Sequence, residues 1–277
     1  MEITIAELRN HLSVQNYSKS TIINYPYQVD KLCKFCNKQP HEINEIDFKE
    51  FTEHLVYNTN LSWNTIHQFH GGISYFFRTF LKNTAYTKYV KYPKRPKILP
   101  VILSVSEVRN IFDHIINLKH STILKLFYST GIRLSELRML TLDCVDFERR
   151  TIKINGGKGR KDRYVGISNV MYSELKEYIE VYEPAIYLFE SPKLKRYYSE
   201  GALRHIIVKI KKDLQLRKKI SVHSFRHAFA THMIEQGGNI LTLQKWLGHA
   251  SLNATMIYLH TQNTDISKGP NPLDNLE

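Results

Sequence analysis

In the first third of the chain, apolar residues recur at the spacing expected of helices. They lie three and four positions apart in four runs, residues 3–12, 21–36, 48–57 and 66–81, which polar breaks separate. Ser18 and Asn64 stand just before the second and fourth runs. A side-chain oxygen there can accept a hydrogen bond from a free helix amide, so we expect both residues to be N-caps. The pattern predicts a small helical domain over residues 1–90.

A short basic segment interrupts this periodicity. Residues 91–100 hold three prolines and four basic side chains. Proline lacks a backbone N–H and cannot continue a helix, so we expect an extended basic linker there. A second domain then covers residues 101–277. Such a linker suits two basic domains that close around a duplex, although an ordinary surface connection explains it equally well.

The second domain opens with a capping box, in which the side chains of Ser104 and Glu107 each accept from the other's backbone amide. We expect one helix from there to about Leu118 and another from 124 to 130. Two short β-prone runs, 151–155 and 163–167, flank a glycine-rich basic segment, which is the pattern of a hairpin with a basic tip. Helical spacing resumes in residues 171–181, 203–214, 224–236, 242–247 and 254–258. The fold class predicted is mainly α with a small β-sheet in the second domain.

The charge of the chain favours a polyanionic partner. The formal net charge is +13. Residues 1–100 carry 13 Lys and Arg against 8 Asp and Glu, a balance of +5 that leaves +8 for the rest. Both halves are basic without a polylysine block, which suits a protein that holds nucleic acid between two domains. Net charge alone also fits a basic protein with no nucleic-acid role.

Secretion, membranes and disulfides are not indicated. The chain starts with acidic residues where a secretory signal needs basic ones, and no apolar run approaches the roughly 20 residues that span a bilayer. Three cysteines fit a reducing compartment, and we expect a cytoplasmic protein without a membrane partner. Cys33 and Cys36 form a Cys-x-x-Cys pair, but Cys144 is the only other thiol, so we expect ordinary helix thiols and no zinc site.

Six side chains of the second domain could handle a phosphodiester: Arg133, Lys158, His223, Arg226, His249 and Tyr258. They supply two guanidiniums, an ammonium, two imidazoles and a phenol. The sequence offers no carboxylate cluster or Cys/His cage for a metal beside them. This set suits attack on phosphorus by a tyrosine better than metal-assisted hydrolysis, so no metal and no other cofactor is expected.

Each of these residues also has a plainer interpretation by itself. Arg133 starts a helix just after Gly131 closes the previous one, where anions are favoured, but it could equally be a surface partner of Glu136. Lys158 stands between two glycines at the hairpin tip, in the company of several other basic residues. Spacing alone therefore does not single out either side chain.

The other four residues are more informative together than singly. His223 and Arg226 lie three apart on one helix and face the same way, so they could hold one phosphate from two sides. His249 ends the next helix, and Tyr258 follows on a short one. The chain has 17 tyrosines, so packing is the default role for any one of them.

In this order, the residues resemble the signature boxes of the tyrosine recombinase (phage integrase) family, most of all its Xer-like and integron-integrase branch. The matching motifs are Thr130-Gly-Ile-Arg-Leu-Ser-Glu-Leu, Gly157-Lys-Gly-Arg-Lys-Asp-Arg, His223-Ser-Phe-Arg-His-Ala-Phe-Ala-Thr-His, Leu247-Gly-His and Ile257-Tyr. They cover residues of about 100 to 260. The first third resembles the family's SAM-like core-binding domain more weakly. The resemblance implies that this domain and an α+β catalytic domain form a C-shaped DNA clamp.

The resemblance also implies a role for each matching residue. Arg133 and Arg226 would bind the nonbridging phosphate oxygens, His249 would hydrogen-bond the phosphate, and Glu136 would orient a neighbouring side chain. Two departures stand out. Ala254 occupies a position where the family often has threonine, and the tail after His260 lacks the apolar helix that many relatives dock into a neighbour.

Three further residues would carry out the covalent and proton-transfer steps. Lys158 would protonate the 5′ leaving oxygen and His223 would assist proton transfer. Tyr258 would become a 3′-phosphotyrosine, which preserves the bond energy for religation.

The function implied is that of a site-specific DNA recombinase. It would act as a homotetramer on two paired double-stranded sites with short inverted repeats, with accessory DNA-bending proteins as candidate partners. Integration, excision, inversion and dimer resolution all remain open. A type IB topoisomerase, which uses a similar residue set, and a catalytically silent DNA-binding protein are the alternatives. Pure binding does not need Tyr258, which argues against the second alternative.

Overall fold

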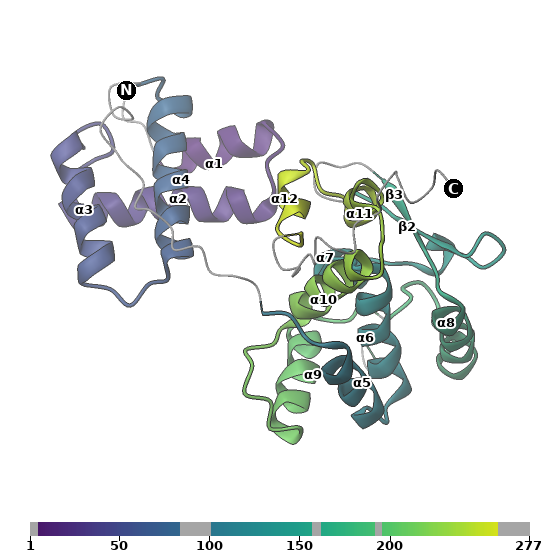
Figure 1. Ribbon diagram of the computed structural model, residues 1–277. Coiled ribbons are helices and arrows are strands. Elements are labelled where there is room, and N and C mark those ends of the chain that lie inside the picture. Colours follow the sequence, from purple (N-terminus) through teal and green to yellow (C-terminus); the bar gives the residue numbers. More distant parts are fainter. Residues whose placement is uncertain (1–4, 84–100, 157–161, 192–195, 260–277) are drawn as a thin grey trace, which may run out of the picture. The chain divides into compact units, whose positions relative to one another are not determined.

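The structure, a computed structural model, describes residues 5–83, 101–156, 162–191 and 196–259 (Figure 1). The chain divides into two compact units, Met1–Ile98 and Leu99–Glu277. Each unit has its own hydrophobic core. The expected linker, residues 91–100, and the tail after His260 lie outside the described residues.

The described part of the first unit is helical, as predicted. Its elements are α1 (Ile5–Val14), α2 (Lys19–Cys36), α3 (Glu45–Tyr57) and α4 (Trp63–Tyr75), which a π-helical turn (Phe76–Phe80) continues. Helix α2 contacts the other three helices. The core consists of apolar side chains at the helical spacing, among them Leu8, Leu12, Val29, Leu32, Phe48, Phe51, Ile66, Phe69 and Phe76.

One of the two predicted N-caps is correct. Ser18 caps α2, with its Oγ accepting from Thr21 N at 3.2 Å. Asn64 is not a cap, because Ser62 has the extended backbone of an N-cap and its Oγ accepts from Thr65 N at 3.2 Å. The first two residues of α4 are exposed, so the hydrophobic pattern did not mark where the helix begins.

The second unit combines helices with a small sheet (Figure 1). Its elements are α5 (Val105–His114), α6 (Leu118–Thr130), α7 (Leu134–Arg138), a 3-10 turn (Leu142–Cys144), β1 (Val145–Asp146), β2 (Thr151–Ile154), β3 (Arg163–Gly166), α8 (Asn169–Tyr182), α9 (Glu200–Asp213), α10 (Val222–Glu235), α11 (Ile240–Leu247) and α12 (Asn253–Met256). Helix α6 packs between α8 and α10 and is buried over most of its length. The observed fold class is the one predicted: mainly helical, with a small sheet in the second unit.

The expected helix from Ser104 to about Leu118 is too long. Helix α5 ends at His114, because Ile115 leaves the helical conformation with φ −90° and ψ 105°. Asn117 then caps α6, its Oδ1 accepting from His120 N at 3.0 Å. The capping box at the start of α5 is confirmed.

The sheet has three antiparallel strands in the order β1-β2-β3. The predicted hairpin corresponds to β2 and β3, whose register pairs Ile152 with Val165 and Ile154 with Arg163. Ile152 and Val165 are buried and join the core of this unit. The sequence did not reveal β1, because two residues are too few to show an alternation.

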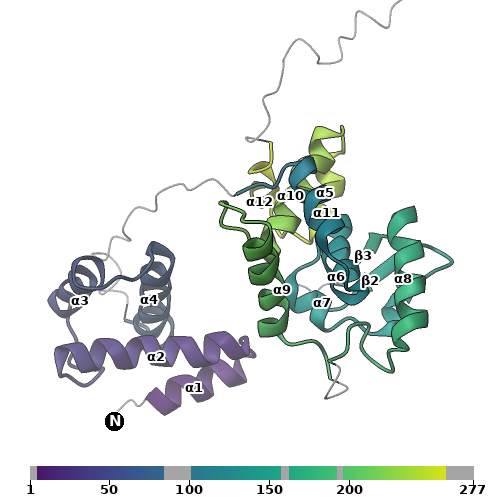
Figure 2. The same ribbon diagram turned by 90° about the horizontal axis from the view of Figure 1, so that it is seen from below.

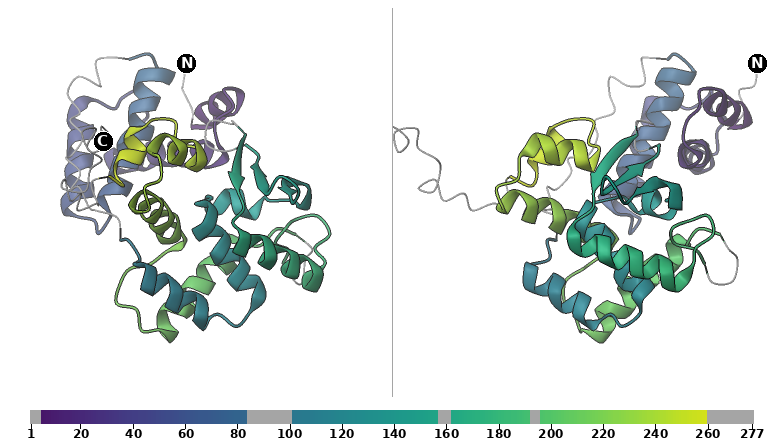
Figure 3. Two further views of the ribbon diagram at one scale, coloured as in Figure 1. Left: turned by 45° about the vertical axis from the view of Figure 1, so that its right-hand side comes forward. Right: turned by 90° about the vertical axis from the view of Figure 1, so that its right-hand side faces the viewer.

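A separate apolar cluster brings the end of the described chain against α10. It contains Ala230, Leu243, Leu247 and Tyr258. Helix α11 contacts α10, α12 and β3, and Figures 2 and 3 show α10, α11 and α12 gathered together. The packing of apolar residues therefore carries Tyr258 to the helix that holds the His223 and Arg226 motif.

The three cysteines are free thiols. Cys33 and Cys36 both lie in α2, as expected. Burial, with Asp30 nearby, raises the pKa of the Cys33 thiol to about 11, which disfavours the reactive thiolate. Within the described ranges, no three His, Cys, Asp or Glu side chains gather as metal ligands would.

None of the helices in the described segments is both long and apolar enough to cross a membrane.

Candidate active site

The junction between α6 and α7 positions Arg133. Helix α6 ends at Thr130, and Gly131 follows with a φ of +60°, in the left-handed region. A Cβ on Gly131 would lie 2.6 Å from Phe229 Cδ1 and 2.7 Å from Leu247 Cδ2, so both the backbone and the space require glycine. Arg133 then caps α7. The predicted helix break at Gly131 and restart at Arg133 is confirmed.

Glu136 connects two arginines. Its carboxylate accepts from Arg133 N at 2.9 Å and Arg133 Nη1 at 2.8 Å, and from Arg163 Nη1 and Nη2 at 2.9 and 2.7 Å. Glu136 is only 8% exposed. Burial by itself would raise the pKa of this carboxyl, but the bonds from Arg163 and Arg133 outweigh burial and lower it to about 2. The contact between Arg133 and Glu136 is thus part of a buried network and not an isolated surface pair.

Backbone carbonyls hold both arginines of the candidate pair. Arg226 is 6% exposed and donates from Nη1 to Gly131 O and from Nη2 to Leu247 O. Arg133 Nη2 donates to Gly248 O at 3.0 Å. Burial first, and then the charge of Arg133, lowers the pKa of Arg226 to about 10. Two cations in one buried corner favour an anion between them.

His249 lies against Arg226. Its Nε2 is 2.9 Å from Arg226 Nη2 and its Nδ1 is 2.9 Å from Thr255 Oγ1. Because a guanidinium can only donate, Nε2 is the acceptor, and we assign the ring proton to Nδ1, which donates to Thr255. Thr255 is fully buried. Thr255, whose hydroxyl fixes the imidazole, was not among the predicted site residues, although it directly follows Ala254, the position that departs from the family pattern.

Tyr258 is 3% exposed, and its hydroxyl lies 3.0 Å from His227 Nδ1. Burial raises the pKa of the phenol, while the charges of Arg226 and Arg133 oppose the rise. The hydroxyl is therefore within electrostatic reach of both guanidiniums. His227 was missed as a site residue, although it stands inside the quoted motif, next to Arg226 and one helical turn after His223.

His223 stands in the first turn of α10 at the open side of the site. With Arg133 it borders a cavity of about 600 Å³, which Ser135, Arg204 and Ser221 also line. Partial burial, followed by the charges of Arg226 and Arg133, lowers the pKa of the His223 ring. The neutral form of the imidazole is thus favoured near pH 7.

Five of the six candidate residues lie in this one region, which α7, α10, α11 and the segment around α12 build. Lys158 lies outside the described residues. The strands on either side of it are described: Arg163 of β3 donates from Nε to Trp246 O at 2.7 Å and so fastens the hairpin to α11. Arg163 is therefore a structural anchor, whereas the sequence suggested only another basic residue of the hairpin.

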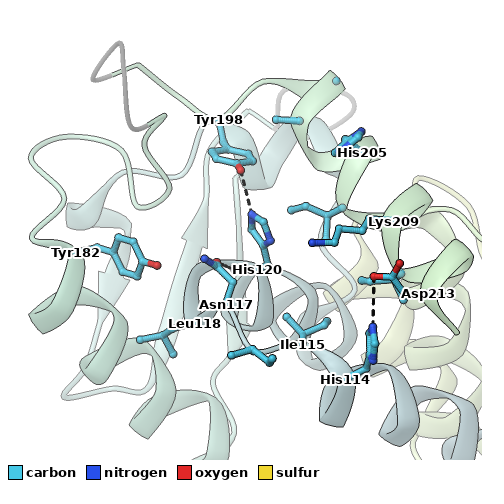
Figure 4. Close-up of a pocket in the computed structure, with 15 residues that line it drawn as sticks. His114, Ile115, Asn117, Leu118, His120, Tyr182, Tyr198, His205, Lys209 and Asp213 are labelled. Carbon is cyan, nitrogen blue, oxygen red and sulfur yellow. Dashed lines mark hydrogen bonds and ion pairs between the residues drawn. The ribbon is translucent and has the colours of Figure 1, made fainter.

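A larger cavity of about 990 Å³ lies elsewhere in the second unit (Figure 4). Residues of α5, α6 and α9 line it. Two side-chain contacts join residues of this lining, His114 with Asp213 and His120 with Tyr198. None of the five candidate residues that the structure describes contributes to this lining. Size alone therefore does not identify the reactive site of this protein.

Comparisons with known proteins show what the chain as a whole is similar to. Residues 102–265 match the model of the phage integrase family, and residues 5–86 match that of the phage integrase N-terminal SAM-like domain. A tyrosine recombinase of Thermosipho africanus is 30% identical over 263 residues, which are 91% of this chain and 92% of the relative. The crystal structure of XerA recombinase is 27% identical, covers 95% of both chains and gives a TM-score of 0.56. XerH recombinase bound to its difH substrate is 25% identical with a TM-score of 0.72, over 91% of this chain and 79% of that one.

Proposed function

Because this chain belongs to the phage integrase family and is a site-specific recombinase that cleaves and rejoins DNA, we propose that Tyr258 is its nucleophile and forms a 3′-phosphotyrosine intermediate. This proposal rests on the position of the Tyr258 hydroxyl. The residue is buried, and it lies close enough to Arg226 and Arg133 for their charges to oppose the rise in the pKa of the phenol. A phosphate bound by both guanidiniums would lie beside the phenol. No finding favours topoisomerase activity or silent binding.

Arg133 and Arg226 bind the nonbridging oxygens of the scissile phosphate. Carbonyls of Gly131, Leu247 and Gly248 fix the planes of the two guanidiniums in advance. Donors that are already oriented stabilise the charge of the transition state without reorganising, and each commonly contributes about 10² to 10³ in rate. The loss of either arginine should nearly abolish cleavage.

His249 becomes a hydrogen-bond donor to the phosphate once DNA is bound. In the structure its Nε2 accepts from Arg226 and its Nδ1 donates to Thr255. An incoming phosphate attracts the guanidinium and favours a second proton on the ring. With both nitrogens protonated, the imidazole keeps its bond to Thr255 and donates from Nε2 to a phosphate oxygen.

Lys158 protonates the 5′ oxygen as it leaves, the role that the resemblance gives it. Glu136 keeps Arg133 in place by accepting from its backbone amide and its guanidinium. The phosphotyrosine bond conserves the energy of the broken phosphodiester, so a 5′ hydroxyl of a partner strand can displace Tyr258 without ATP.

The substrate is double-stranded DNA with short inverted repeats, and a homotetramer holds two such sites together. The positive charge of both halves of the chain supports the DNA partner, as does the resemblance to XerH solved on its difH substrate. Accessory DNA-bending proteins are candidate partners. The protein acts in the cytoplasm, where its DNA lies.

A nicked suicide site tests the nucleophile. DNA flanking the coding region is searched for short inverted repeats, nicked near the cleavage point and incubated with the protein. Wild-type protein should form a covalent adduct that denaturing gels resolve, and Tyr258→Phe should form none while it still binds the site. Tyr172→Phe is the matched control, because this ring packs on Phe147 in another part of the unit. An adduct with Tyr258→Phe would disprove the assignment.

A further inference from the structure

His227 contacts the oxygen that is proposed to attack phosphorus. Its Nδ1 lies 3.0 Å from the Tyr258 hydroxyl, and the two ring centroids are 5.8 Å apart. His227 follows Arg226 directly on α10. The helix that carries this arginine of the phosphate clamp therefore also carries a hydrogen-bond partner of the proposed nucleophile. The resemblance assigned no role to this residue.

The direction of this hydrogen bond follows from the surroundings. Burial raises the pKa of the Tyr258 phenol, although Arg226 and Arg133 oppose the rise. Burial, followed by the charges of His223 and Arg226, lowers the pKa of His227. Near neutral pH the phenol is therefore protonated and the imidazole is neutral, and we assign the ring proton to Nε2, so that the hydroxyl donates to Nδ1.

Attack on phosphorus requires that the phenolic proton leave. As the bond from the Tyr258 oxygen to phosphorus forms, this oxygen becomes an ester oxygen with little basicity. An acceptor within hydrogen-bond distance is the geometry that general-base catalysis needs. His227 accepts a hydrogen bond from the Tyr258 hydroxyl, whereas His223 borders the cavity beside Arg133.

We propose that His227, through Nδ1, is the proton acceptor for Tyr258 in DNA cleavage, an inference that rests on the proposed role of Tyr258 as the nucleophile. The bond between Tyr258 and phosphorus forms as the bond from phosphorus to the 5′ oxygen breaks. The phenolic proton moves to Nδ1, which makes His227 an imidazolium. The leaving 5′ oxygen takes its proton from Lys158. In religation the 5′ hydroxyl attacks phosphorus and gives its proton to the Lys158 amine, while the bond from phosphorus to the Tyr258 oxygen breaks and the imidazolium returns its proton to that oxygen.

Substrate binding makes this transfer favourable. Without DNA, an imidazolium at His227 is unfavourable, because the ring is partly buried and lies near His223 and the charged Arg226. A phosphate between Arg133 and Arg226 brings the opposite charge to this corner. Proton transfer is thereby coupled to DNA binding, and Tyr258 stays protonated when no phosphate is present.

Two substitutions separate a proton acceptor from a group that only holds the hydroxyl. In His227→Asn the side-chain amide occupies the place of Nδ1 and can still accept a hydrogen bond, but it cannot take the proton. Single-turnover adduct formation by the full-length protein on the nicked site should fall about 10²- to 10³-fold, while DNA affinity stays the same. His205→Asn, at an exposed position of the same unit, is the matched control and should cleave normally.

Two further arms identify which proton is moved. Replacing the 5′ bridging oxygen by sulfur gives a leaving group that needs no protonation, so the His227→Asn defect should persist on this substrate if His227 serves Tyr258. Added imidazole should restore part of the activity of His227→Ala, which no purely structural role would allow.

Three outcomes would overturn the proposal. The first is a cleavage rate of His227→Asn that is within about threefold of the wild-type rate or faster. The second is full recovery of the His227→Asn cleavage rate on the sulfur substrate. The third is a failure of imidazole to restore any activity to His227→Ala. Failure of the proposed function itself would show differently, as an adduct formed by Tyr258→Phe.

Discussion

Removing the charge of Glu136 should destabilise the second unit by about 3 kcal/mol. The carboxylate accepts hydrogen bonds from Arg133 and Arg163, and its pKa falls from the ordinary 4.5 to about 2. Since one pKa unit corresponds to about 1.4 kcal/mol, this difference is worth about 3 kcal/mol at neutral pH. Removing one partner of a buried ion pair typically costs 3–5 kcal/mol, which agrees in size. Glu136→Gln keeps the shape of the side chain, removes its charge and replaces one of its two acceptor oxygens by an NH2 group.

The effect has a defined pH dependence. A carboxyl whose pKa is depressed in the folded state contributes its stability above the unfolded pKa of about 4.5 and loses it as the pH falls toward 2. The difference in unfolding free energy between wild type and Glu136→Gln should therefore be full at pH 7 and shrink between pH 5 and pH 2. Cleavage at neutral pH should slow as well, because a neutral amide with one acceptor oxygen holds the Arg133 guanidinium less firmly than the carboxylate does.

Tryptophan fluorescence can measure this unit separately. The chain has two tryptophans, and Trp63 and Trp246 lie in different units. In a Trp63→Phe background, urea unfolding followed by fluorescence reports on Trp246, whose carbonyl accepts from Arg163. Glu148→Gln, at an exposed position, is the control and should change little. A difference below about 1 kcal/mol at pH 7, or one that stays constant down to pH 3, would refute the reasoning.

Three further measurements probe the same region. Gly131→Ala should cost about 3 kcal/mol in unfolding free energy, from left-handed strain and a clash with Phe229, whereas Gly156→Ala, with the same φ of +60° and open space, should cost only about 1–2 kcal/mol. Thr255→Val removes the hydroxyl that accepts a hydrogen bond from His249, so adduct formation should slow about tenfold while the unfolding free energy falls by only about 1 kcal/mol. An unchanged rate of adduct formation would show that Thr255 does not contribute to cleavage. The logarithm of the association constant for duplex DNA, measured by fluorescence anisotropy, should fall linearly with the logarithm of the salt concentration, with a slope of about −0.9 per phosphate contacted. An association constant that does not change with salt would exclude a phosphate-dominated interface.

Helical periodicity predicted most of the architecture, because each helix buries one face at a regular spacing. It failed where the decisive residues are exposed or too few. The start of α4 is set by Ser62 in an exposed turn, and the break between α5 and α6 depends on the backbone of Ile115. Strand β1 has two residues, so only pairing with β2 reveals it. These features come from backbone hydrogen bonding, which the polarity pattern does not encode.

The candidate site was predictable to the extent that its residues follow one another in recognisable motifs. The order of the motifs gave Arg133, His223, Arg226, His249 and Tyr258, and the structure gathers all five. Apart from Glu136 beside Arg133, it did not give the partners of these residues, because long stretches of chain separate residues that meet across the fold.

Arg163 illustrates this limit. By composition it is one of several basic residues in a hairpin, and only the pairing of β3 with β2 and the contact with α11 bring it to Glu136. His227 is similar, since it meets Tyr258 only after α12 folds back toward α10. Sequence spacing indicates which residues share a helix face, but packing decides which of them touch.

The protonation states of the site point to control by the substrate. Burial and the neighbouring guanidiniums lower the pKa values of His223, His227 and Arg226, and burial raises that of Tyr258. A phosphate in this corner would raise the pKa values of both imidazoles, which prepares His227 to receive a proton while the two arginines are neutralised. The nucleophile is then activated by the group that it attacks. A recombinase that must not react with stray phosphodiesters gains selectivity from this arrangement, because only a DNA backbone held by both guanidiniums supplies the charge that lets the proton move.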